Sequence, residues 1–212
     1  MSKKFGLLLF AVTVLSLLGH LFLYPSLPDV IPIHWGVSGQ ADGFGPKYMD
    51  LILAAIPLGM LLLFWVIPKI DPRRGNYQKH QGVYTGFIAL MTLFLIGVSW
   101  AAAAIGMGIP LSIDRIICFL LGAVFLITGN YMPRIQSNFT FGIRTPWTIE
   151  NETVWKKTHR LGGFGFCLGG ILFLIAAVIS HPVARILPVA FLILMTVSIY
   201  VYSYVLFRRL AK

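Results

Sequence analysis

Residues 83–105 read VYTGFIALMTLFLIGVSWAAAAI, a stretch of twenty-three residues without a charged side chain. A helix of roughly 20 apolar residues crosses the hydrocarbon core of a bilayer, so this stretch is long enough to span a membrane. The whole chain has the same character: 58% of its 212 residues are hydrophobic, 11% are charged and the mean hydropathy is +0.83. A soluble domain of this size could not bury so much apolar surface, so we expect lipid to surround most of the chain.

Five more apolar runs lie on either side of this stretch, at residues 5–23, 50–68, 112–132, 163–180 and 184–206. Together they predict an all-α integral membrane protein with six transmembrane helices. The basic start of the chain resembles a signal peptide. Its apolar run, however, ends in His20, Leu21 and Phe22 and has no small-residue cleavage site. We therefore expect the first run to be retained as a span.

Lys and Arg residues fall mainly on one side of these six spans. If the N-terminus is cytoplasmic, fourteen of the seventeen lie inside and only Lys47, Arg115 and Arg185 lie outside. The inside set is Lys3, Lys4, Lys69, Arg73, Arg74, Lys79, Arg134, Arg144, Lys156, Lys157, Arg160, Arg208, Arg209 and Lys212. This asymmetry predicts a plasma-membrane protein with both termini in the cytoplasm. The net charge of +10 is then explained by basic side chains that face anionic lipid of the inner leaflet. We expect no direct nucleic-acid binding.

The longest outer segment, residues 24–49, is rich in proline and ends in turn-forming residues. Its prolines favour extended, partly rigid backbone. One interpretation is a docking surface for an extracellular peptide; the other is a structured cap with a tryptophan at the headgroup level. The residues expected to face such a peptide are Pro28, Pro32, His34 and Trp35. Asp29, His34 and Asp42 form no recognisable metal-binding motif, so no metal site is predicted.

The inner segment 141–163, FGIRTPWTIENETVWKKTHRLGG, holds both glutamates and two of the five tryptophans of the chain. Thr145 followed by Pro146 is a typical helix start. Acidic residues follow early and basic residues late, which complements the helix dipole. Gly162 and Gly163 then favour a helix end. This pattern predicts a short amphipathic helix lying flat on the cytoplasmic interface.

Polar and aromatic residues also crowd the stretch before this helix, which an interface anchor does not require. Two interpretations remain open: a brace whose polar groups satisfy one another, and a recognition surface for a cytoplasmic protein or an inner-leaflet ligand. The other inner loop, 68–82, is basic and is interpreted as a topology anchor. Gly165 and Gly169 form a G-x-x-x-G pair, which favours either dimerisation or packing within the chain.

Catalytic motifs are missing from the sequence, which contains no G-x-S-x-G, H-E-x-x-H, P-loop or C-x-x-C pattern. Cys118 and Cys167 lie in apolar runs and are interpreted as core residues. His159 could exchange a proton with Glu150 or Glu152, but a histidine near a helix end more often complements the dipole. We expect no enzyme activity, cofactor or metal. A transporter or flippase and an intramembrane enzyme remain the alternatives, and the absence of charges near span centres disfavours transport.

Several inner motifs resemble the SdpI family. They are Asn130-Tyr131-Met132-Pro133, Asn138, the run from Phe141 to Thr148 (FGIRTPWT), Val154-Trp155 and Thr158-His159-Arg160. The outer loop, with Leu27-Pro28, the run from Ile31 to Trp35 (IPIHW) and Gly39, resembles the small domain of unknown function that often precedes this family. The resemblance implies a three-span N-terminal region, 1–105, and an SdpI-like region, 106–212, with the signature segment at 130–163.

The resemblance also implies a function. Such proteins give immunity to a secreted, membrane-active peptide toxin and act as receptors that sequester a small DNA-binding autorepressor at the membrane. Toxin contact is then expected to shift a two-state helix arrangement and expose the signature to this partner. The partner-binding residues expected from the signature are Asn130, Pro133, Asn138, Gly142, Arg144, Thr145, Pro146, Trp147, Trp155, Thr158, His159 and Arg160.

Overall fold

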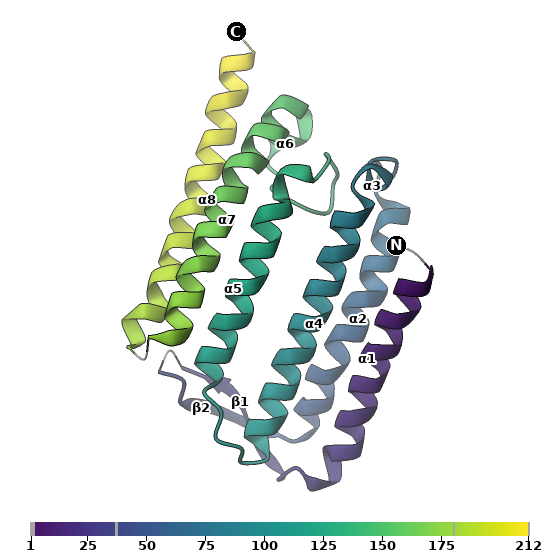
Figure 1. Ribbon diagram of the computed structural model, residues 1–212, viewed down its shortest axis with the longest axis vertical. Helices are drawn as coiled ribbons and strands as arrows, with labels where there is room; N and C mark the ends of the chain where they lie inside the picture. Colours follow the sequence, from purple (N-terminus) through teal and green to yellow (C-terminus); the bar gives the residue numbers. More distant parts are fainter. Residues whose placement is uncertain (1–2, 37, 180, 212) are drawn as a thin grey trace.

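Six long apolar helices form the body of the molecule, for which a computed structural model describes residues 3–36, 38–179 and 181–211 (Figure 1). They are α1 (Lys3–Leu23), α2 (Tyr48–Ile70), α4 (Gln81–Gly106), α5 (Ile113–Tyr131), α7 (Glu152–Val178) and α8 (Pro182–Leu210). Each is long and apolar enough to cross a membrane, so the prediction of six spans is confirmed. Ser180, the expected end of the fifth span, and Lys212 lie outside the described residues.

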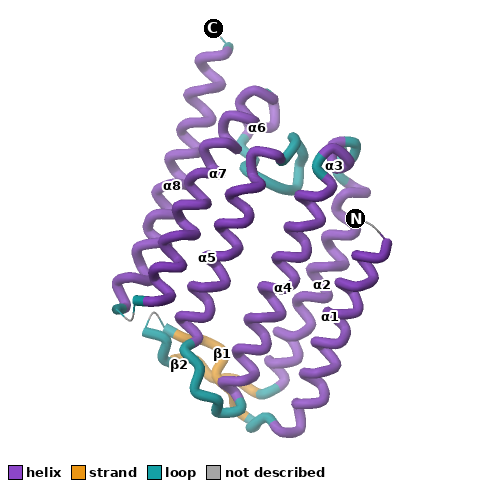
Figure 2. The backbone as a smooth tube through the Cα atoms, viewed as in Figure 1, coloured by secondary structure: helices purple, strands orange, loops and turns teal. Residues whose placement is uncertain are grey.

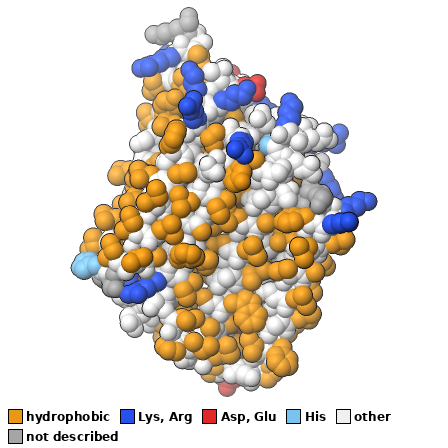
Figure 3. Space-filling model, in the orientation of Figure 1, with side chains coloured by type: hydrophobic (Ala, Val, Ile, Leu, Met, Phe, Trp, Pro, Cys, Tyr) orange, Lys and Arg blue, Asp and Glu red, His pale blue; other side chains and the backbone are white. Residues whose placement is uncertain are grey.

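Short elements cap the two ends of this bundle (Figure 2). They are η1 (Tyr24–Ser26), β1 (Val30–Trp35), β2 (Ala41–Pro46), α3 (Asn76–Lys79), η2 (Met132–Arg134) and α6 (Pro146–Glu150). The strands lie at one end, named here the hairpin end. The elements α3 and α6, the start of α1 and the end of α8 lie at the other, named the basic end. Figure 3 shows why: on the face in view, Lys and Arg gather toward that end, and hydrophobic side chains cover the middle.

The spans pack as two groups of three, with α1, α2 and α4 in one group and α5, α7 and α8 in the other. Contact between α4 and α5 joins the two groups. The helices α5 and α7 approach closely because glycines face each other: a Cβ added at Gly129 would lie 2.7 Å from the carbonyl oxygen of Gly163. Small residues at such contacts let helix backbones approach in a membrane, where lipid leaves no hydrophobic force between helices.

Gly165 and Gly169 face α8, where a side chain at either position would meet Met195 or Leu192 respectively. The G-x-x-x-G pair is therefore used for packing within the chain, which was one of its two interpretations.

The expected short interfacial helix is wrong in its extent. The helix α6 ends at Glu150, and α7 begins after Asn151, whose side chain accepts hydrogen bonds from the N–H groups of Thr153 and Val154 at 2.9 and 3.0 Å. The helix then continues through Gly162 and Gly163 without a break. These two glycines do not end a helix, because they allow close contact with Ile143 and with Gly129 on α5. The amphipathic residues are thus the first turns of a span.

The outer segment forms an antiparallel β-hairpin, which the sequence did not predict. Val30 pairs with Pro46, Ile31 with Gly45 and Trp35 with Ala41, with irregular register between these pairs. The hairpin packs on the end of α4, where Ile31 lies over Gly106. The all-α description therefore holds for the membrane-spanning part, and a small sheet covers the hairpin end.

Candidate functional site

The buried carboxylate of Asp71 organises the loops at the basic end. It lies directly after α2 and accepts four hydrogen bonds, from the Arg73 N–H at 2.7 Å, the Tyr77 hydroxyl at 2.8 Å, the Phe139 N–H at 3.0 Å and the Thr140 hydroxyl at 2.9 Å. Two of these donors come from its own loop and two from the loop after α5. Asp71 therefore ties together loops that leave the two different helix groups.

These donors also set the charge state of the carboxylate. Burial alone would raise the pKa of Asp71, but the hydrogen bonds from Arg73, Tyr77, Thr140 and Phe139 outweigh it and hold the pKa below its ordinary value. Burial, together with the neighbouring negative charge of Asp71, raises the pKa of Tyr77 to about 12. Tyr77 therefore stays a neutral donor, and Asp71 stays an ionised acceptor at neutral pH.

A second set of contacts crosses between the same two loops. The Arg73 guanidinium donates to the Ser137 hydroxyl and, at 2.8 Å, to the carbonyl of Ile149. It also lies 4.9 Å from the centre of the Phe139 ring, within cation–π range. The Asn76 amide donates to the carbonyl of Ser137 at 2.7 Å. We name the residues Asp71, Arg73, Tyr77, Ser137 and Thr140 the loop clamp.

Asn138, a predicted site residue, shapes the second loop from within. Its amide donates to the carbonyls of Gln136 and Phe141 at 2.9 and 3.0 Å, and its side-chain oxygen accepts from the N–H groups of Thr140 and Phe141 at 2.9 and 2.7 Å. The side chain is fully buried. Asn138 thus fixes the turn that presents Phe139 and Thr140 to Asp71.

Trp155 and His159 anchor the loop to α7. The Trp155 indole N–H donates to the carbonyl of Ile135 at 2.7 Å, and its ring stacks on the imidazole of His159 with centroids 4.1 Å apart. His159 Nε2 accepts from the N–H of Ile143 at 3.0 Å, so the ring proton is on Nδ1, which donates to the Trp155 carbonyl at 2.9 Å. Gly142 packs directly against Nε2 with φ of 104°, a conformation that favours glycine.

Both ring nitrogens of His159 are therefore hydrogen-bonded to backbone groups, and the ring is not placed to exchange a proton with Glu150 or Glu152. Glu152 pairs with Lys156 at 3.0 Å on the exposed side of α7. The expectation that His159 lies near a helix end is also wrong, because α7 continues for five turns beyond it.

The start of α6 is held by a capping box and by α8. The Thr145 side chain accepts from the N–H of Thr148 at 3.2 Å, while the Thr148 hydroxyl accepts from the N–H of Thr145 at 2.9 Å. The Thr145 hydroxyl also donates to Ser203 on α8 at 3.0 Å. Trp147 contacts two α8 tyrosines, Tyr200 and Tyr204, each with ring centroids 5.0 Å apart.

The twelve predicted signature residues therefore divide by exposure. Five are buried and used inside the protein: Asn138, Thr145, Trp155, Thr158 and His159. Six are exposed and Trp147 is half-buried; the exposed ones are Asn130, Pro133, Gly142, Arg144, Pro146 and Arg160. The buried residues form an internal brace, one of the two interpretations. Asn138, Thr145, Trp155 and His159 make the hydrogen bonds given above, whereas the Thr158 hydroxyl has no hydrogen-bond partner among the described residues. In the described arrangement only the exposed signature residues and the half-buried Trp147 can contact a partner.

At the hairpin end, Pro28 and His34 are exposed, and Pro32 and Trp35 are half-buried. His34 hydrogen-bonds to Asp42 across the hairpin, and Asp29 pairs with Lys47 at 3.0 Å. The tip of the hairpin reaches the start of α5, because a Cβ added at Gly39 would lie 2.6 Å from a carboxylate oxygen of Asp114. No cluster of three or more metal-ligating side chains occurs among the described residues.

Several functional candidates were missed from the sequence. The 68–82 loop, interpreted as a topology anchor, supplies Asp71, Arg73 and Tyr77 to the loop clamp. A buried pair also joins α1 and α2, where His20 Nδ1 lies 3.0 Å from Asp50. A second pair, Arg185 with Asp114, joins α8 to α5. Each charged residue lies near the end of an apolar run, where the sequence alone suggests only a span boundary.

Comparison with known proteins supports the resemblance. Residues 134–205 match the SdpI/YfhL protein family, and residues 11–61 match a domain of unknown function, DUF1648. The chain is 26% identical to the immunity protein SdpI of Bacillus subtilis (strain 168) over 199 residues, which cover 94% of each chain. No solved structure matches the chain. The first match begins at the end of η2 and includes α6, and the second includes the β-hairpin.

Proposed function

Because residues 134–205 of this chain match the SdpI/YfhL protein family, we propose that it is an immunity protein that protects the cell from a secreted, membrane-active peptide toxin. The similarity to a Bacillus subtilis immunity protein, which extends along 94% of both chains, supports this function. The protein is a multi-pass membrane protein. Its place is the bacterial plasma membrane, with the basic end and both termini cytoplasmic, where Lys and Arg face the anionic inner leaflet.

In this orientation the β-hairpin meets the toxin outside the cell. Pro28 and His34 are exposed there, and Trp35 is half-buried beside them. An aromatic residue with prolines on a short hairpin offers a stiff apolar anchor for an extracellular peptide, and it loses little conformational entropy on binding.

At the cytoplasmic end the protein acts as a receptor that sequesters a small DNA-binding autorepressor. The exposed signature residues supply the contact. Arg144 and Arg160 carry charges suited to acidic groups of a protein partner, and Pro146 and Trp147 add apolar area between them. The buried signature residues hold this surface in shape.

The loop clamp is the observation that carries the proposal. Asp71 follows α2, whereas Phe139 and Thr140 follow α5. The hydrogen bonds of the clamp therefore depend on the position of one helix group relative to the other. The Arg144 guanidinium donates to the carbonyl of Phe139, which places it one residue from the clamp. At the opposite end the hairpin tip touches Asp114 of α5. A toxin that moves the hairpin thus shifts the two groups, and the clamp conveys this shift to Arg144.

Replacing Arg144 and Arg160 together by alanine tests the receptor role. Both side chains are exposed, so the double variant is expected to fold. A Bacillus subtilis strain without its own SdpI, carrying this chain, would be challenged with the toxin while a fluorescent repressor is imaged. We expect survival to persist and recruitment of the repressor to the membrane to fall at least tenfold.

The matched control is Arg208→Ala with Arg209→Ala, which removes the same charge from the end of α8 at the same end of the molecule. It should leave recruitment unchanged. If the chain with its natural residues gives no protection, the immunity function is contradicted. If protection is complete but the Arg144 and Arg160 variant recruits normally, only the receptor role is contradicted.

A further inference from the structure

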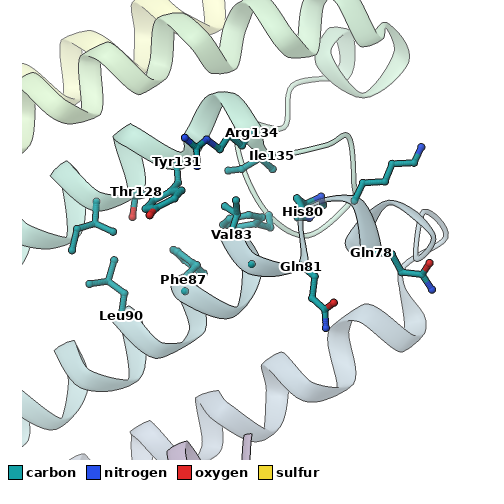
Figure 4. A pocket seen from close by; sticks show the side chains of 15 residues that line it. Gln78, His80, Gln81, Val83, Phe87, Leu90, Thr128, Tyr131, Arg134 and Ile135 are labelled. Atoms are coloured by element: carbon teal, nitrogen blue, oxygen red, sulfur yellow. The ribbon is translucent and has the colours of Figure 1, made fainter. Parts of the chain in front are cut away.

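A cavity of about 690 Å³ lies between α4 and α5 at the basic end (Figure 4). It is formed by the first turns of α4, the last turns of α5 and the residues around His80 and Phe141. Along α4 the lining extends from Gln81 to Leu90, a helical rise of about 13 Å. The hydrocarbon core of a bilayer is about 30 Å thick, so the cavity extends from the headgroup level well into one leaflet.

The lining changes in character along this depth. Phe87, Leu90 and Ile127 make the deep part apolar, whereas Lys79 and Arg134 bring positive charge to the part next to the loops. Figure 4 shows Tyr131 and Arg134 on the α5 side facing Val83 and Phe87 on the α4 side. The Arg134 guanidinium rests over the Tyr131 ring, 5.3 Å from its centre. No acidic residue is among the lining side chains of the described chain.

Two buried polar atoms in the lining have no hydrogen-bond partner among the described residues, His80 Nε2 and Thr128 Oγ1. His80 is 3% exposed, and its Nδ1 accepts a long hydrogen bond of 3.4 Å from the N–H of Gln136. Burial lowers the pKa of His80 more than a hydrogen bond to the Asn76 backbone raises it, so the ring is neutral at pH 7. A buried polar atom left unpaired is costly, which indicates that a polar group of a ligand fills this position.

We propose that this cavity binds one anionic phospholipid, whose phosphate lies between Lys79 and Arg134 with its headgroup beside His80, and whose acyl chain lies along Phe87 and Leu90. A free phosphate would leave the apolar depth unfilled, and a zwitterionic lipid would leave the positive charge only partly balanced. The lipid seals the seam between the two helix groups at its basic end. This inference rests on the six spans crossing a membrane and not on the immunity function.

Native mass spectrometry of the full-length protein in detergent, with equimolar phosphatidylglycerol and phosphatidylcholine, tests the site. The unmodified protein should retain one phosphatidylglycerol. Gly86→Leu should lose it, because a Cβ at this lining residue meets nothing within 4 Å and the added side chain enters the cavity without a clash. Lys79→Ala with Arg134→Ala should lower the preference for phosphatidylglycerol about 30-fold, since each basic residue contributes about 1 kcal/mol near anionic lipid.

Two matched controls separate the cavity from general effects. Gly59→Leu places the same side chain at an open position on α2, away from the cavity, and Arg208→Ala with Arg209→Ala removes the same charge elsewhere. Both should bind lipid as the unmodified protein does. The proposal is overturned if the unmodified protein retains no lipid or shows no preference between the two lipids. It is equally overturned if Gly86→Leu retains phosphatidylglycerol as well as Gly59→Leu does.

Discussion

The hydroxyl of Thr140 donates a 2.9 Å hydrogen bond to the carboxylate of Asp71, across 69 residues of sequence. Asp71 follows the second span and Thr140 follows the fourth, so this contact joins the two groups of helices at their basic end. The N–H of Phe139 reaches the same carboxylate oxygen at 3.0 Å. The inner loops are therefore one structural unit.

Asp71→Asn should destabilise the protein by about 1–3 kcal/mol. Both carboxylate oxygens of Asp71 accept hydrogen bonds, so the NH₂ group of an asparagine would face at least one N–H or O–H donor in a buried site. We expect a lower thermal unfolding midpoint in detergent, measured by tryptophan fluorescence. Arg74→Gln is the control, since Arg74 is an exposed side chain of the same loop and should leave the midpoint unchanged. An Asp71→Asn midpoint equal to that of the control would show that the loop clamp adds no stability.

The same carboxylate should make the stability depend on pH. The pKa of Asp71 lies below its ordinary value of 3.8, so the ionised form is favoured by folding. Its contribution is complete above pH 3.8 and is lost as the pH falls toward the pKa of the folded state. The difference in unfolding midpoint between the unmodified protein and Asp71→Asn should therefore be full at pH 7 and should shrink near pH 3. A difference that grows on acidification would contradict a pKa of Asp71 that is lower in the folded state than in the unfolded state.

Gly142→Ala should cost on the order of 2–4 kcal/mol of unfolding free energy. Gly142 has a φ of 104°, and its added Cβ would collide with Nε2 of His159, which breaks the hydrogen bond from the Ile143 N–H. Gly59→Ala is the matched control, because it lies in an open helical position and should be neutral or stabilising by up to about 1 kcal/mol. Equal midpoints for the two variants would argue against this packing.

The buried pair of His20 and Asp50 predicts unequal effects of two substitutions. Asp50→Ala removes the partner of a fully buried imidazole and should destabilise the protein by about 3–5 kcal/mol. Asp50→Asn keeps an oxygen that accepts from His20 Nδ1–H and should cost much less. Expression level and unfolding midpoint of the two variants measure the difference. Two equally stable variants would mean that the pair contributes only packing.

The sequence was sufficient for the spans and for the sorting of charges, because both follow from local composition. The runs at 83–105 and 112–132 match α4 and α5 within two residues at each end. The signature motifs likewise identified the family whose match covers residues 134–205. These features need no knowledge of which segments meet in space.

The contacts between segments could not be obtained in this way. Asp71 looked like one residue of a basic topology anchor, because its two donors from the other helix group, Phe139 and Thr140, lie more than sixty residues further along the chain. The hairpin escaped notice because its prolines and irregular register hide the alternation typical of strands. Gly162 and Gly163 suggested a helix end, as they would in water. Within a membrane protein their small size is used for close helix packing instead.

Labelling of single cysteines in intact cells tests most directly the claim that the basic end faces the cytoplasm. In a background with Cys118→Ala and Cys167→Ala, His34→Cys and Arg144→Cys each place a thiol on an exposed residue at opposite ends of the molecule. A membrane-impermeant maleimide should label His34→Cys in intact cells and Arg144→Cys only after permeabilisation. Labelling of Arg144→Cys in intact cells, with His34→Cys protected, would contradict the orientation and the receptor role built on it.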